Sequence, residues 1–131
     1  MASGLVAVEA GRLLDLSLTG SSATAVPQTP WKLALASTTT SASAAGTEVT
    51  AGSGRATITF TGAGTLVTGV TDNVSTLSFT TMPAATTTDI NIYDSTGTPR
   101  RLWWGALASS KTTASGDTLS FAAGAVDVTL T

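Results

Sequence analysis

The chain has 131 residues but few charges, with 6 Lys or Arg, 8 Asp or Glu and a net charge of −2, and it contains no His and no Cys. Without His and Cys, the commonest general bases, thiol nucleophiles and zinc ligands are missing, so we expect neither an enzyme nor a metal site. Phosphate binding needs clustered Lys and Arg, and the one adjacent basic pair is Arg100–Arg101, so we expect no nucleic-acid partner.

The apolar segments are short. None approaches the roughly 20 residues that a membrane-spanning helix needs, and no basic segment precedes an apolar run as in a signal peptide. The acidic residues are scattered almost singly, and several stand at expected turns, where Asp normally bonds to its own backbone. We therefore expect no cofactor and no membrane contact, with synthesis in a cytosol.

Residues 1–25 differ from the rest of the chain, because apolar residues alternate there with charged ones. The spacing allows a short helix over residues 8–16, although the alternation of Leu14, Leu16 and Leu18 fits a strand as well. The segment either packs on its own domain or forms an arm that reaches a neighbouring subunit. In the second reading its contact residues are Leu5, Val6, Val8, Leu13, Leu14 and Leu16.

Residues 26–131 are predicted to form a single all-β domain. Pro27 and Pro30 hold its start extended, and Trp31–Ala36 then alternates large and small residues, as in a strand with one buried face. Residues 37–54 are expected to be a surface loop. Strands are predicted at 31–36, 55–61, 66–70, 74–80, 89–94, 101–107, 118–121 and 125–130. About seven or eight short strands divided by Gly and Pro turns indicate an antiparallel sandwich or barrel.

Two of these strands, 89–94 and 101–107, are predicted to pair as a hairpin. It contains adjacent tryptophans, which point to opposite faces of a strand, so one can fill the core while the other meets solvent, a loop or a partner. Surface Trp is common both in protein interfaces and in sugar-binding platforms. The candidate contact residues here are Tyr93, Arg100, Arg101, Trp103 and Trp104. Coverage of the second Trp by a loop of the same chain is the alternative.

The low charge also bears on assembly. Monomeric β proteins place charges or Pro on exposed strand edges to prevent pairing with other chains. The predicted strands at 57–61 and 74–80 carry no charge. We therefore expect other subunits to cover part of this surface, in a homo-oligomer such as a trimer.

Several ordered motifs resemble those of small β-rich virion proteins of tailed phages, which are labelled tail-fibre-like, minor structural or head-decoration proteins. The resemblance covers residues 26–131. The motifs are Trp31-Lys-Leu-Ala-Leu35, Gly46-Thr-Glu-Val49, Ile58-Thr-Phe60, Ile92-Tyr-Asp94, Leu102-Trp-Trp-Gly-Ala-Leu107, Gly116-Asp-Thr-Leu-Ser-Phe121 and Gly124-Ala-Val-Asp-Val-Thr-Leu130. The resemblance implies a structural virion component without catalytic activity.

The leading hypothesis is a capsid decoration protein on the outer surface of a phage head. It would bind the major capsid protein through residues 5–18 and the tryptophan hairpin, and it would stabilise the shell by mass action. The alternative is a tail fibre or baseplate module that binds a host receptor or a carbohydrate beside an exposed Trp. Both hypotheses place the protein in the virion.

Overall fold

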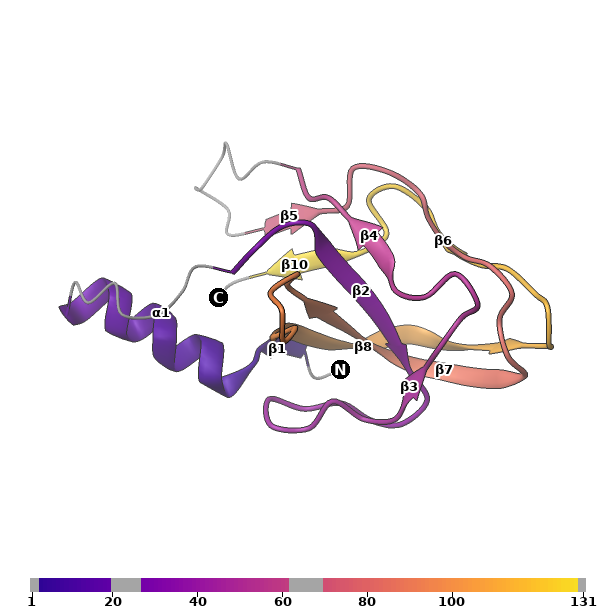
Figure 1. Ribbon diagram of the computed structural model, residues 1–131, viewed down its shortest axis with the longest axis horizontal. Helices are drawn as coiled ribbons and strands as arrows, with labels where there is room; N and C mark the ends of the chain where they lie inside the picture. Colours follow the sequence, from indigo (N-terminus) through magenta and orange to yellow (C-terminus); the bar gives the residue numbers. More distant parts are fainter. Residues whose placement is uncertain (1–2, 20–26, 62–69, 130–131) are drawn as a thin grey trace.

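A computed structural model describes residues 3–19, 27–61 and 70–129, as a β domain from which one helix extends (Figure 1). The all-β prediction with an N-terminal helix is confirmed. Because Leu14, Leu16 and Leu18 all lie in this helix, the strand alternative for them is wrong. The elements are β1 (Ser3–Leu5), α1 (Ala7–Thr19), β2 (Trp31–Ala36), β3 (Glu48–Val49), β4 (Ala56–Ile58), β5 (Val70–Asp72), β6 (Leu77–Phe79), β7 (Ala85–Tyr93), β8 (Arg101–Thr113), β9 (Leu119–Phe121) and β10 (Asp127–Thr129).

The main sheet is antiparallel and has the strand order β1-β8-β7-β2-β3, with β4 sharing the edge of β2 next to β3. Its longest ladder is the β7–β8 hairpin, in which Ile92 lies opposite Trp103 and Thr86 opposite Thr112. The predicted hairpin is thus confirmed. Both strands are longer than expected, because their Thr-rich ends continue the pairing, as suits β-branched residues on a half-exposed sheet.

Two short ribbons, β10–β5 and β6–β9, complete the fold. Phe79 of β6 meets Phe121 of β9 edge to face, with ring centroids 6.3 Å apart. The ribbons share one hydrophobic core with the main sheet, built mainly from Leu33, Leu35, Ile58, Leu77, Phe79, Met82, Ile92, Leu119 and Val126. The strands predicted at 55–61, 74–80, 118–121 and 125–130 are found as β4, β6, β9 and β10. Most of the strand predicted at 66–70, and Leu130, lie outside the described residues.

The expectation of one buried face on β2 is wrong, because Ala34 and Ala36 are buried as fully as the leucines between them. The segment 37–47 covers this second face. It is fixed where Asp89 accepts hydrogen bonds from the backbone N (2.9 Å) and Oγ1 (2.8 Å) of Thr40. The predicted surface loop 37–54 thus buries Thr40 and also contains β3.

Polar side chains of β7 and β8 also form hydrogen bonds to the segment 37–47. Asn91 donates from Nδ2 to the carbonyl of Ala45 (2.9 Å). Arg101 donates to the carbonyls of Ala44 (2.7 Å) and Ala42 (3.2 Å), and to Asn91 Oδ1 (3.1 Å). Because buried polar groups are costly unless they are bonded, these contacts fix the path of the segment across the sheet.

The turn between β7 and β8 closes around a buried carboxylate. Asp94 accepts hydrogen bonds from the backbone N (2.7 Å) and Nε (2.9 Å) of Arg100 and from Thr96 Oγ1 (2.8 Å). Burial by itself raises the pKa of Asp94, but the bonds from Arg100 and Thr96 outweigh it and lower the pKa to about 2. The carboxylate is therefore charged at neutral pH and orders the turn.

We expect Asp94→Asn to destabilise the fold by about 2 kcal/mol at pH 7, because the amide cannot replace the charged partner of Arg100. The folded pKa lies below the unfolded value, so this contribution is complete above pH 4 and is lost as the pH falls from about 4 to about 2. Urea denaturation at pH 7 and pH 2.5, followed by circular dichroism, measures the difference. A gap between the two proteins that stays constant over this pH range would contradict the assignment.

Candidate interaction surfaces

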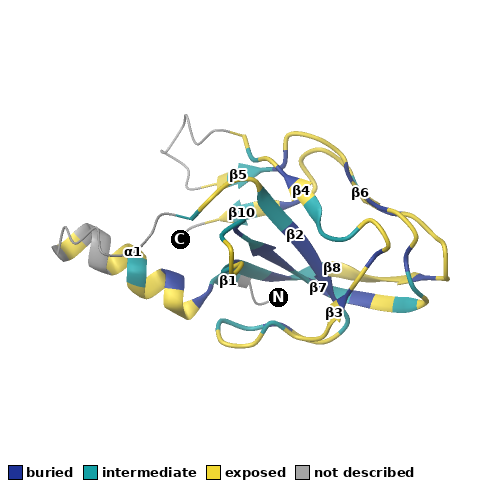
Figure 2. Cartoon of the chain, viewed as in Figure 1, coloured by how far each residue is buried: buried dark blue, intermediate teal, exposed yellow. Residues whose placement is uncertain are grey.

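The first candidate surface is α1, which is fixed to the β domain only at its start. Val6 is buried and its backbone N donates to Leu102 O (2.8 Å), while Ala7 N donates to Ala42 O (3.2 Å). In the first turn Glu9 is buried and forms an ion pair with Arg12. Beyond this turn α1 extends away from the sheet (Figure 1), and its residues there are mostly exposed (Figure 2).

Large apolar side chains are exposed along α1. Val8 is 61% exposed, Leu13 47%, Leu14 59% and Leu18 75%, values that core leucines never reach in this domain. Of the other predicted contact residues, Leu5 is half-buried opposite Trp103, and the side chain of Leu16 lies outside the described residues. Val6 is buried in its own domain and serves to attach the helix. Of the predicted N-terminal contact residues, Val8, Leu13 and Leu14 are therefore the exposed ones on the helix, while Leu5 and Val6 belong to the β domain.

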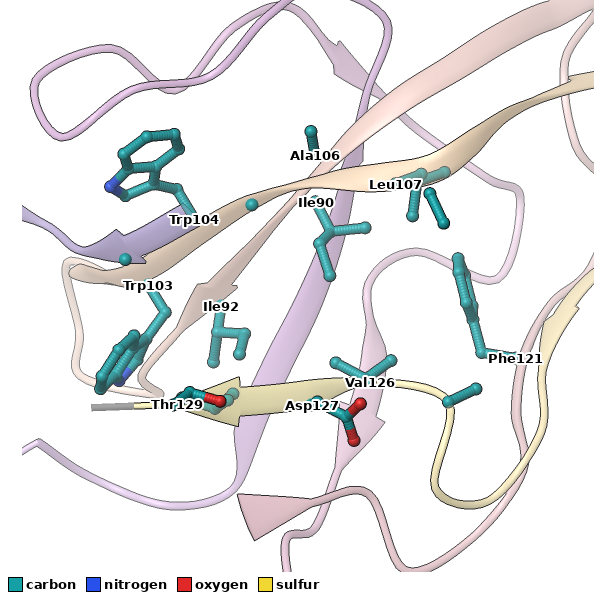
Figure 3. Close-up of a pocket in the computed structure, with 15 residues that line it drawn as sticks. Ile90, Ile92, Trp103, Trp104, Ala106, Leu107, Phe121, Val126, Asp127 and Thr129 are labelled. Carbon is teal, nitrogen blue, oxygen red and sulfur yellow. The ribbon is translucent and has the colours of Figure 1, made fainter. Parts of the chain in front are cut away.

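The second candidate surface lies next to the turn of the β7–β8 hairpin, at the beginning of β8. Trp103 points to the core side with Ile92, and Trp104 points to the opposite side, where Asn91 is its neighbour across the ladder (Figure 3). Both rings are half-buried. The indole Nε1 of Trp104 is buried and finds no hydrogen-bond acceptor among the described residues. The prediction that the two rings lie on opposite faces is confirmed.

The polar candidates of this hairpin contact their own chain. Arg100 pairs with Asp94 (2.9 Å), and Arg101 holds the segment 37–47. Tyr93 is covered by the guanidinium of Arg55, whose centre lies 3.8 Å from the ring centroid. Arg55 also forms an ion pair with Glu48 (2.7 Å). Arg100, Arg101 and Tyr93 are therefore held in place by contacts within their own chain.

Sequence reasoning missed a third surface, a groove of about 290 Å³ between β8 and β10. Ile90 and Leu107 point from the main sheet toward Val126 and Phe121, and Trp103 forms one end of the groove beside Thr129 (Figure 3). The alternation of Val126 and Val128 indicated an inward face for this strand. The sequence could not show which strand lies across from it, because strand order depends on long-range pairing.

Within 3–19, 27–61 and 70–129, no three Asp or Glu side chains gather as they would around a metal ion. In the same ranges no helix has both the length and the apolar character needed to cross a membrane.

Comparison with known proteins gives one result for nearly the whole chain. A family model described as "Podophage GP4 fiber I protein gp80" matches residues 5–129. A search of curated proteins finds no match. The matched range begins in β1 and ends in β10, so it includes α1, the tryptophan hairpin and the groove.

The two tryptophans should differ in their effect on stability. Trp103→Ala removes a ring that packs on the core, and we expect a loss of about 3 kcal/mol. Trp104→Phe keeps an aromatic ring but removes a buried donor that has no acceptor among the described residues, so stability should stay within about 0.5 kcal/mol or rise. Urea denaturation followed by circular dichroism compares the variants. Equal losses would contradict the placement of the rings.

Proposed function

This chain belongs to the podophage GP4 fiber I protein gp80 family and is thus a fibre-type structural protein of a phage virion, and we propose that α1 holds it in the fibre assembly. The observation that carries the proposal is the exposure of Val8, Leu13 and Leu18 on a helix that extends from the domain. These three residues follow one another at steps of five, so they lie on different sides of the helix, and a partner that buries them must pack around α1. A helix of 13 residues is marginal alone, so burial against a partner would stabilise it.

The opposite end of the β domain has a different character. The start of β7 and the end of β8 lie there, farthest from α1 (Figure 1). Ser109, Ser110, Lys111 and Thr112 are exposed, and Thr112 Oγ1 lies 3.0 Å from Thr86 Oγ1. Uncharged hydroxyl groups with one Lys make a polar, well-hydrated surface. This polarity supports an orientation in which α1 faces the virion and the polar end faces outward.

The family description names a fibre, which supports the tail-fibre alternative better than head decoration. Within the fibre reading, the tryptophans lie at the α1 end of the domain, because β1 pairs with Trp103, Trp104 and Gly105. This position favours a role near the assembly contact over a carbohydrate site at the outward end. We propose a role without catalysis, in which the β domain is a structural unit of the fibre.

Gold-labelled antibody against this chain, applied to intact virions and viewed by electron microscopy, tests the placement. We expect the label on fibres at the tail. Label spread over the head would contradict the fibre placement and would favour capsid decoration.

Replacing Leu18 by Lys should prevent incorporation of the protein into virions. Leu18 is 75% exposed, so the change should leave stability within about 0.5 kcal/mol. A cation in the last helical turn also suits the helix dipole, so the helix itself should persist. The measurement is the amount of this protein in purified virions after complementation with the variant, determined by immunoblot.

The matched control is Thr118→Lys, which adds the same charge at an exposed position between β8 and β9. We expect normal incorporation of this variant. If the Leu18 variant were incorporated as well as the control, α1 would not be the attachment element.

A further inference from the structure

Among the described residues, backbone hydrogen bonds join the start of α1 to the β domain at three places. β1 pairs with β8, and Val6 N donates to Leu102 O of the same strand (2.8 Å). Ala7 N donates to Ala42 O (3.2 Å), which lies in the segment 37–47 between β2 and β3. The first two contacts therefore lie along one strand, and the third joins α1 to a different part of the fold.

We propose that the segment 37–47 sets the direction in which α1 leaves the β domain, that Arg101 positions this segment, and that attachment to the fibre depends on this direction. Two contacts along one strand leave α1 free to swing about that strand, whereas a contact away from the strand removes this freedom. Arg101 acts through the segment and is thus a positioning residue. The inference rests on the proposed function, in which α1 holds the chain in the fibre.

One carbonyl oxygen connects Arg101 to the helix. Nη2 of Arg101 donates to Ala42 O (3.2 Å), the same atom that accepts a hydrogen bond from Ala7 N. A carbonyl oxygen has two lone pairs and can accept both bonds. Nη1 of Arg101 donates to Ala44 O (2.7 Å) and to Asn91 Oδ1 (3.1 Å). The planar guanidinium therefore fixes the acceptor of the helix relative to the sheet.

The segment 37–47 is cross-linked by its own hydrogen bonds, so it can transmit this position. Ser41 N donates to Ala44 O (2.9 Å), and Ala44 N donates to Ser41 Oγ (3.1 Å), which closes the turn nearest α1. Thr40 bonds through its backbone N and its hydroxyl to the buried carboxylate of Asp89. In Figure 1 this loop between β2 and β3 extends toward the start of α1.

The contact from the segment also completes the beginning of the helix. The first backbone N–H groups of a helix have no acceptor within the helix itself. Ala7 is the first residue of α1, so Ala42 O supplies the acceptor that its N–H needs. A helix that is already held in one direction loses less orientational freedom when it binds, so this preorganisation favours attachment.

The absence of Cys makes the direction of α1 measurable by spin labelling. Labels on a protein with Leu18→Cys and Thr118→Cys, both at exposed positions, report the distance from the end of α1 to the β domain by pulsed electron paramagnetic resonance. We expect one narrow distance distribution in this protein and a broader one after Arg101→Met is added. Met keeps an apolar stem but has no N–H donor for the segment. Circular dichroism checks that each variant is folded.

The matched control is Arg55→Met, which removes two hydrogen bonds to Glu48 and should leave the distance distribution narrow. Amide hydrogen exchange adds a comparison within one molecule. With Arg101→Met, the amide of Ala7 should exchange about tenfold faster, because its acceptor is no longer held in place. The amide of Val6, which bonds to β8, should exchange at an unchanged rate.

The outcomes separate this inference from the proposed function. An unchanged distance distribution with Arg101→Met would overturn the positioning role. An Ala7 amide that exchanges as fast as an exposed one in the unchanged protein would also overturn it, and this measurement needs no variant. In virions we expect less Arg101→Met than Arg55→Met protein, and equal amounts would overturn the dependence of attachment on direction. If Leu18→Lys were incorporated normally, the proposed function itself would fail.

Discussion

The antiparallel ladder between β7 and β8 is the interaction on which the other surfaces depend. Its turn is ordered by the buried carboxylate of Asp94, and its register places Ile92 opposite Trp103. The far edge of β8 binds β1 and thereby sets the point from which α1 leaves the domain. The core face of β8 forms one wall of the groove. An altered register in this hairpin would therefore change the arm, the tryptophans and the groove together.

Several of the few charged residues are used in contacts within the β domain. Arg55 and Arg100 pair with acids of their own domain, and Arg101 bonds to backbone carbonyls and to Asn91. Three of the six Lys and Arg residues thus hold parts of the β domain together. Few charges remain to keep other chains away from α1 and the groove. For a protein that works in an assembly, a weakly protected surface is compatible with its role.

Local patterns predicted most of the elements and part of the candidate site. Alternation identified β2, β4, β6 and β10, and the adjacency of Trp103 and Trp104 placed their rings on opposite faces. The helix was ambiguous, because its leucines fit two periods. The cover over β2 was missed, since the bond between Thr40 and Asp89 joins residues 49 positions apart. The groove was missed for the same reason, because it depends on how β10 lies beside a strand that is distant in sequence.

The segment over β2 is held mainly through its backbone. Asn91 and Arg101 bind the carbonyl oxygens of Ala42, Ala44 and Ala45, groups that every amino acid possesses. Among these contacts Thr40 is the residue whose side chain bonds to the sheet. Apart from Thr40 and from Gly46, where a Cβ would lie 2.6 Å from Thr38 O, much of the sequence of this segment can therefore change while it keeps the same course. This patch of surface can therefore differ in sequence without a change in the domain beneath it.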